Sequence, residues 1–214
     1  VLFSPTAPKL KRMAAVWEAK VEEAGLVPGA GSHGHTKAPQ PRDRTADPLP
    51  QPLDADALDR LAADKKVDGS EANGSSIAFV LEFGGHRGKR VLLAGDAHAS
   101  VLTSALRRYA EMVGEDKVRL DLVKLSHHGS NANVSTKMLD MIDCHRFLVS
   151  TNGDNFAHPD DAALAKIIRA ASGPVTFFCN YRSKRIEPWS VEGPAIGATF
   201  EFPKSSSASL RVKA

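Results

Sequence analysis

The feature that most constrains the fold of this chain is an alternation of strand-like and helix-like segments that begins near Ser75. Apolar runs typical of buried strands are separated by segments in which apolar residues recur every three or four positions, as on one face of a helix. The strand-like runs are Ile77–Phe83, Arg90–Ala94, Leu122–Leu125, Phe147–Ser150, Val175–Cys179 and Thr199–Phe202. The helix-like segments between them are Val101–Val113, Ser135–Ile142 and Asp160–Ala171. This alternation predicts an α/β fold, with helices packed against a sheet.

The residues before this region are organised differently. Val1–Thr6 has the pattern of a strand end, and an amphipathic helix is predicted after Pro8, with an apolar stripe made of Leu10, Met13, Trp17 and Val21. Six prolines fall between residues 27 and 53, which predicts a flexible linker or insertion, and a short helix is expected over Asp54–Ala63. We therefore expect a strand end and helix over 1–26, a Pro/Gly-rich linker or insertion over 27–74, the main domain over 75–203 and a tail over 204–214.

Charge and cysteine content exclude few functions. The net charge of +3 is too small, and too widely spread, to indicate nucleic-acid binding by itself. Cys144 and Cys179 lack the paired spacing of a zinc ribbon, so both are predicted to be buried thiols. Because no apolar run approaches the roughly 18 residues of a membrane span, no membrane segment is predicted, and we expect a cytoplasmic location.

Three of the strand-like runs end in loops that carry groups able to bind a metal or move a proton. Asp96 follows the run that ends at residue 94, His127 and His128 follow the run that ends at 125, and Asn155 and His158 follow the run that ends at 150. Positions 96, 127 and 158 are 31 residues apart, so neighbouring parallel strands would bring all three loops to one edge of the sheet. A carboxylate and imidazoles there suit Zn²⁺, Mn²⁺ or Fe²⁺, and a metal so held turns bound water into a nucleophile. The pattern therefore predicts a hydrolase.

Four motifs surround these loops in a fixed order: Asn73-Gly74-Ser75-Ser76-Ile77, Leu92-Leu93-Ala94-Gly95-Asp96, Ser126-His127-His128-Gly129-Ser130 and Asn155-Phe156-Ala157-His158-Pro159. Together they resemble the second half of the metallo-β-lactamase domain of ComEC-type competence proteins, over roughly residues 69–171. The resemblance implies a metallo-β-lactamase-like αββα sandwich. This chain would hold only its second half, with an N-terminal helix and a Pro-rich insertion.

The same resemblance implies roles for individual residues. Asp96 would bridge two ions, Zn²⁺ or Mn²⁺, and His158 would be the last metal ligand. His127 and His128 would either bind metal or hold the substrate phosphate and protonate the leaving group, and the sequence leaves open which of them faces the site. Asn155 is a further catalytic candidate. The implied activity is metal-dependent hydrolysis of a phosphodiester, in nucleic acid or a nucleotide, by a metal-activated water.

One departure from the family pattern puts the completeness of the site in doubt. Complete members carry an earlier His-x-His-x-Asp-His motif, and no such string occurs in this sequence; in the nearest imitation, His33-Gly34-His35, Thr36 and Lys37 follow. We expect that an upstream segment or a partner chain supplies the remaining ligands. This half would then hold one ion weakly, or none.

Each candidate also has a purely structural interpretation. Asp96 suits a helix N-cap or a turn, His127 and His128 suit turn positions, and His158 suits the cap of the helix that follows it. His98 is expected at a solvated helix start. For the whole chain, the alternative to an enzyme is a noncatalytic module, truncated or degenerate, that acts in binding or in assembly with a partner.

Overall fold

A sheet of seven strands forms the centre of the structure, a computed structural model that describes residues 1–25, 48–63, 67–85, 88–154, 156–205 and 209–212. The strands lie in the spatial order β1-β2-β3-β5-β7-β8-β9. Their bounds are Leu2–Ser4 (β1), Ala78–Phe83 (β2), Lys89–Leu93 (β3), Leu122–Lys124 (β5), Arg146–Val149 (β7), Val175–Cys179 (β8) and Ala198–Glu201 (β9). β2 runs antiparallel to β1 and β3, whereas the strands from β3 to β9 pair in parallel. The predicted α/β class is confirmed.

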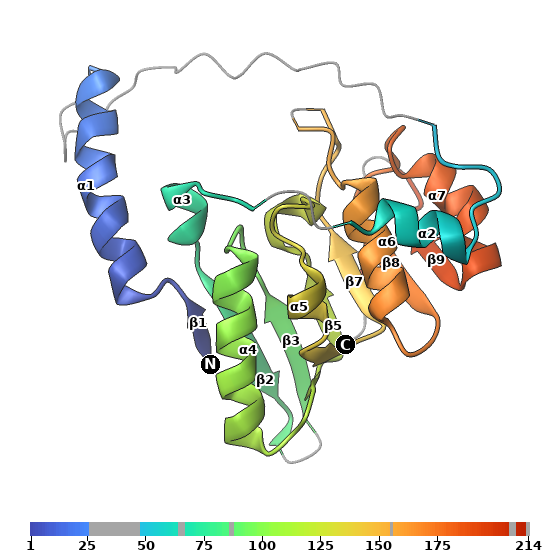
Figure 1. The fold of residues 1–214 in the computed structure, drawn as a ribbon, viewed down its shortest axis with the longest axis horizontal. Coiled ribbons are helices and arrows are strands. Elements are labelled where there is room, and N and C mark those ends of the chain that lie inside the picture. The colour runs from blue at the N-terminus through green and yellow to red at the C-terminus, as the bar shows by residue number, and fades with distance from the viewer. Residues whose placement is uncertain (26–47, 64–66, 86–87, 155, 206–208, 213–214) are drawn as a thin grey trace.

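Helices connect the parallel strands and cover one face of the sheet (Figure 1). The helices are Ala7–Glu23 (α1), Ala55–Leu61 (α2), Glu71–Gly74 (α3), Ala99–Val113 (α4), Thr136–Leu139 (α5), Asp161–Ala170 (α6) and Glu187–Glu192 (α7). α5 packs between α4 and α6, and α2 packs against α6. α4 ends at Gly114, whose φ of 72° places it in the left-handed region that favours glycine.

The main core lies between these helices and the sheet. Every second side chain of the central strands points into it, among them Val80, Leu92, Val123, Phe147 and Phe177. Leu102 and Leu106 of α4 and Leu58 of α2 meet them from the helical side. Burial of apolar surface at this interface is the main source of stability for such a layered fold.

The opposite face of the sheet is also apolar. Val91, Leu122 and Phe178 form a second, smaller cluster there, packed against Leu210 and Val212 near the end of the chain. On β2, two side chains of this face, Leu81 and Phe83, are 46% and 48% exposed. β2 pairs antiparallel with both neighbours, an arrangement in which one face of the sheet is often left to solvent.

Some elements differ from the sequence-based expectation. The helix expected over Ser135–Ile142 is only one turn, because the chain leaves it to form the short strand β6 (Ile142–Asp143), which pairs with β4 (Val118–Arg119). The predicted Ser135 cap is present and accepts a hydrogen bond from the Met138 amide. Helix α7 and the 3-10 turn Gly193–Ile196 occupy a region where no element was predicted.

Helix α1 is present as predicted, but most of its apolar stripe is not buried. Leu10 and Trp17 are 51% and 58% exposed, and Val21 is buried. The helix lies beside α3, away from the main helical layer (Figure 1). Of the Pro/Gly-rich linker expected over 27–74, residues 27–47 and 64–66 lie outside the described part of the chain, and the described remainder includes α2 and α3. No helix among the described residues is both long and apolar enough to cross a bilayer.

Candidate functional site

The three predicted loops meet at one edge of the sheet, because β3, β5 and β7 are parallel neighbours. Hydrogen bonds between backbones join the loops to each other. The His127 amide donates to the Gly95 carbonyl, and the Asp160 amide donates to the Gly129 carbonyl, each at 2.9 Å. The convergence expected from the sequence spacing is therefore present in the backbone.

The loop after β5 holds two consecutive histidines in an unfavourable backbone conformation. His127 and His128 have φ angles of 44° and 58°, in the left-handed region that non-glycine residues rarely adopt. Such residues cost on the order of 1–3 kcal/mol each and persist where surrounding contacts enforce them, often at functional sites. Here the Ser126 hydroxyl fixes the start of the turn by donating to the Ala97 carbonyl at 2.7 Å.

Three imidazoles lie together at this edge. The ring centroid of His127 is 5.3 Å from that of His158 and 6.1 Å from that of His128. Phe156 stacks on His158, with 6.1 Å between ring centroids. The structure thus brings the predicted histidines into one cluster.

Oxygen acceptors fix the hydrogen position on two of these rings. Nδ1 of His128 lies 2.5 Å from the Ser150 carbonyl oxygen, and Nδ1 of His158 lies 3.2 Å from Oδ1 of Asp160. Because a carbonyl or an ionised carboxylate only accepts, Nδ1 must carry the hydrogen in both rings. Nε2 is then left with its lone pair, the form that accepts a proton or binds a metal.

His127 is held in the same way, through an amide. Its Nδ1 lies 3.1 Å from Oδ1 of Asn133 and 3.6 Å from Oδ2 of Asp68. The Asn133 amide nitrogen donates to Asp68 at 2.8 Å, which turns the amide oxygen toward the imidazole. Asn73 also places its amide nitrogen 3.2 Å from this Nδ1, but that group donates to Asp68 at 2.7 Å. The oxygen contacts therefore assign the hydrogen of His127 to Nδ1 as well.

Asp96 is held beside the cluster by its backbone. Its amide donates to the Ser76 hydroxyl at 2.9 Å, and its carbonyl accepts from the Asn133 amide at 3.2 Å. The carboxylate of Asp96 also interacts with the Lys124 ammonium group. The burial of Lys124 has the larger effect on its pKa and leaves that pKa below its ordinary value, although the negative charge of Asp96 raises it. The preceding residue, Gly95, packs closely against the backbone of Ile77. A side chain would not fit there, since a Cβ on residue 95 would lie 2.5 Å from the Ile77 carbonyl oxygen.

The predicted metal ligands do not form a complete coordination shell. No three His, Cys, Asp or Glu side chains of the described residues are arranged to hold one ion. The imidazole nitrogens suit Zn²⁺, but a structural or catalytic zinc site needs three or four protein ligands. The described donor set therefore does not fit the two-metal centre that the resemblance implies.

Two partly buried carboxylates, Asp68 and Asp160, contact the cluster. Burial raises the pKa of the Asp160 carboxyl, but hydrogen bonds from His158 and the Asn131 amide outweigh it and leave the pKa below its ordinary value. Burial likewise raises the pKa of Asp68, and hydrogen bonds from Asn133, the Ser70 amide and Asn73 bring it below the ordinary value. Both groups are therefore ionised near neutral pH.

Other predicted residues have different outcomes. The prediction that His98 is solvated was wrong, since its side chain is buried and the residue is only 5% exposed. Both ring nitrogens have partners there: Nε2 donates to the Ser70 carbonyl at 2.8 Å, and Nδ1 lies 3.1 Å from Nζ of Lys9. His98, not Asp96, is the N-cap residue of α4. Asn155, His33 and His35 lie outside the described residues. Cys144 and Cys179 are buried as predicted, and burial raises the pKa of each thiol to about 12.

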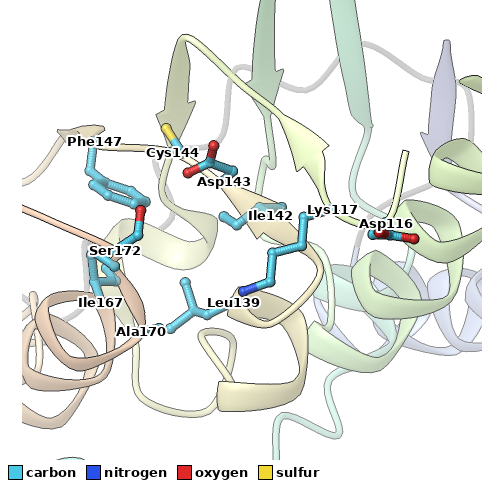
Figure 2. Close-up of a pocket in the computed structure, with 11 residues that line it drawn as sticks. Asp116, Lys117, Leu139, Ile142, Asp143, Cys144, Phe147, Ile167, Ala170 and Ser172 are labelled. Carbon is cyan, nitrogen blue, oxygen red and sulfur yellow. The ribbon is translucent and has the colours of Figure 1, made fainter. Parts of the chain in front are cut away.

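A pocket of about 320 Å³ adjoins the histidines. His128 and His158 line it, together with Ser150, Thr151, Asn152, Phe156, Asn180 and Tyr181. A second pocket of about 440 Å³ lies between α5, β6 and α6, and Figure 2 shows Cys144 and Phe147 on its wall. None of the candidate site residues lines that second pocket. Because His128 and His158 line the first pocket, that pocket is the candidate substrate site.

Sequence reasoning missed the residues that support the imidazoles. Asp68, Asn133 and Asp160 occupy turns or helix starts, where short polar residues are common for purely local reasons. Lys166, 2% exposed, donates to the side chain of Asn131 and to the Val134 carbonyl, and so holds the loop from within the core. The one available signal was a lysine among the apolar positions of α6.

The comparisons with known proteins add no relative. No protein-family model, curated protein or solved structure matches this chain. The case for function therefore depends on the residues at this edge of the sheet.

Proposed function

We propose that this chain hydrolyses a phosphodiester at the edge where His127, His128 and His158 meet. One observation carries the proposal: three neighbouring imidazoles each have an oxygen atom within hydrogen-bonding distance of Nδ1, so Nε2 is the ring atom through which each can exchange a proton. Paired imidazoles in one site supply a general base and a general acid, the two groups that hydrolysis of a diester requires.

His127 is proposed as the general base. Its direct partner at Nδ1 is the neutral Asn133 amide, which orients the ring. Nε2 accepts a proton from water while the water oxygen forms a bond to phosphorus. The imidazolium that results is stabilised by the Asp68 carboxylate at 3.6 Å.

His158 is proposed as the general acid. The ionised Asp160 carboxylate contacts its Nδ1 directly, at 3.2 Å, and so orients the ring. In the protonated ring, Nε2 donates its proton to the leaving oxygen as the bond from phosphorus to that oxygen breaks. The products are a phosphomonoester and an alcohol, and one proton is taken up for each proton released.

The adjoining pocket supports a nucleotide or nucleic acid as the substrate. Phe156 and Tyr181 on its wall are 61% and 51% exposed, and exposed aromatic rings stack on nucleobases. His128 lines the same pocket and is the candidate contact for the phosphate.

The sequence resemblance implies, as a separate proposal, that the reaction also requires a metal ion. Zn²⁺ or Mn²⁺ would need ligands beyond those that the described residues bring together. None of the steps above is assigned to an ion.

The finer fold assignment is also a proposal. The order of the motifs and the single helical layer support the second half of a metallo-β-lactamase-like αββα sandwich, in which a further sheet would cover the exposed Leu81 and Phe83. The same exposed face favours the alternative function, a noncatalytic module that acts in assembly with a partner.

Substrate profiling tests the proposed function. We expect the purified chain to hydrolyse bis(p-nitrophenyl) phosphate and a dinucleotide faster than p-nitrophenyl phosphate, a monoester. Assays with and without Zn²⁺ or Mn²⁺ would show whether an added ion is needed. Hydrolysis of a thioester, a lactone or a β-lactam in preference to the diesters would contradict the proposal. Absence of all turnover from a folded chain would favour the assembly module.

A further inference from the structure

We propose that Asp68 is the positioning residue of this site, which holds His127 in the tautomer that leaves Nε2 free to act as a base. The inference deepens the proposed function and depends on it for its catalytic meaning. Asp68 precedes α3 and is far from the candidate loops in sequence, with His127 on the turn after β5. Its side chain is nevertheless only 10% exposed, and its Oδ2 lies 3.6 Å from Nδ1 of His127.

The two oxygens of Asp68 make different contacts. Oδ1 accepts from the Ser70 amide at 2.8 Å, a local turn contact that any aspartate before a short helix could make. Oδ2 instead accepts from the amides of Asn73 and Asn133, at 2.7 and 2.8 Å, and lies 3.6 Å from Nδ1 of His127. An aspartate that only stabilised the turn would not need the contacts made by Oδ2.

The contacts of Oδ2 determine how Asn133 is oriented. Because the amide nitrogen of Asn133 donates to Asp68 and to the Asp96 carbonyl, its oxygen is directed toward the imidazole. That oxygen accepts the Nδ1 hydrogen of His127 at 3.1 Å. Asp68 therefore acts on the imidazole through Asn133 and, by its charge, directly.

A second histidine fixes the segment that carries Asp68. His98 donates from Nε2 to the Ser70 carbonyl at 2.8 Å, and its Nδ1 faces the ammonium group of Lys9 at 3.1 Å. Nε2 of His98 is also 3.8 Å from Oδ1 of Asp68. Helix α1, through Lys9, thus takes part in holding Asp68 in place.

Nitrogen NMR of the histidine side chains tests the inference without any need for activity. In the wild-type chain, at a pH where His127 is neutral, its Nδ1 should give the chemical shift of a protonated ring nitrogen and its Nε2 that of an unprotonated one. The opposite pattern would overturn the proposal.

Two substitutions separate positioning from folding. Asp68→Asn places an amide among hydrogen-bond donors, whereas Asp68→Ser keeps an acceptor for the Ser70 amide and removes Oδ2. Either variant should shift His127 toward the tautomer with hydrogen on Nε2. Asp121→Asn is the matched control, since Asp121 is a carboxylate of similar exposure that accepts from the Arg90 amide and from Lys89. If the folded Asp68 variants kept the wild-type tautomer, Asp68 would be structural only and the proposal would be wrong.

Hydrolysis supplies the catalytic readout. Loss of a group that orients a reacting histidine typically lowers activity by about 10- to 100-fold, and we expect this fall mainly in kcat with a smaller change in KM. A fall confined to KM would contradict a positioning role. A wild-type chain with the expected tautomer but no turnover would refute the proposed function and leave the assignment of Asp68 to His127 intact.

Discussion

The imidazole rings of His127 and His158 lie 5.3 Å apart between centroids, although they follow different strands of the sheet. Each ring has an oxygen acceptor at Nδ1, provided by Asn133 and Asp160 respectively. Such an arrangement orients two Nε2 atoms without help from a ligand, which is the preorganisation that acid–base catalysis requires.

The rate of diester hydrolysis should depend on pH in a bell-shaped manner. The base must be neutral, so kcat/KM should rise with pH at the acid side, and the acid must be protonated, so kcat/KM should fall at the alkaline side. His158→Gln removes the acid, so this variant should lose the alkaline fall. A pH profile of the wild type and the variant checks this. An unchanged alkaline limb in His158→Gln would assign the acid to another group.

Metal binding by this chain should be weak. Because no three side chains of the described residues are arranged to hold one ion, isothermal titration with Zn²⁺ should show one low-affinity site, which His127→Gln removes. Asp96→Ala should change this affinity little. Tight binding of two ions, abolished by Asp96→Ala, would instead support the two-metal centre implied by the sequence resemblance.

Lys166 should be important for the stability of the histidine loop. Its ammonium group donates to the Asn131 side chain and to the Val134 carbonyl, so Lys166→Met would leave buried acceptors without that donor. Such a loss typically costs about 1–3 kcal/mol. Urea denaturation should show this decrease in the free energy of unfolding, whereas the exposed Lys137→Met should change it by less than about 0.5 kcal/mol. Equal effects of the two substitutions would refute the role of Lys166.

The parts of the site that lie at strand ends were predictable from the sequence. Runs such as Val91–Ala94 are apolar because strands in the middle of a parallel sheet are buried on both faces, and polar residues directly after them must lie at its edge. Equal spacing of Asp96, His127 and His158 then predicted that the loops would meet, since β3, β5 and β7 are neighbours.

The supporting residues could not be predicted in the same way. Asp68 lies 3.6 Å from Nδ1 of His127 although the two residues are far apart in the sequence, and no periodic pattern encodes that approach. His98 is buried beside Lys9, which belongs to helix α1 near the start of the sequence and contacts Nδ1 of His98. Likewise, the apolar stripe of α1 predicted a helix correctly, but periodicity does not say whether a partner covers Trp17.

The stability of the chain should depend on Asp121 at neutral pH and not at low pH. Burial raises the pKa of its carboxyl, but hydrogen bonds from the Arg90 amide and Lys89 leave the pKa below the ordinary 3.8. At pH values around the folded-state and unfolded-state pKa of Asp121, the folded form therefore holds fewer protons than the unfolded form. The stabilisation is fully present above pH 3.8 and is lost as the pH falls through the folded-state pKa.

Asp121→Asn should accordingly lower the free energy of unfolding by on the order of 1 kcal/mol at pH 7. The difference from the wild type should shrink as the pH is lowered below about 4. Denaturation curves at several pH values measure it, and a difference that stayed constant or grew on acidification would contradict the assignment.

The most direct test of the histidine cluster compares the rate of bis(p-nitrophenyl) phosphate hydrolysis by His127→Gln and by the wild type, with folding verified by circular dichroism. His145→Gln is the control, because His145 is half exposed and contacts the Pro174 carbonyl, outside the cluster. Loss of a general base predicts a fall in kcat of about 10²- to 10⁴-fold for His127→Gln and none for the control. A folded His127→Gln chain that hydrolysed the diester at the wild-type rate would contradict the account.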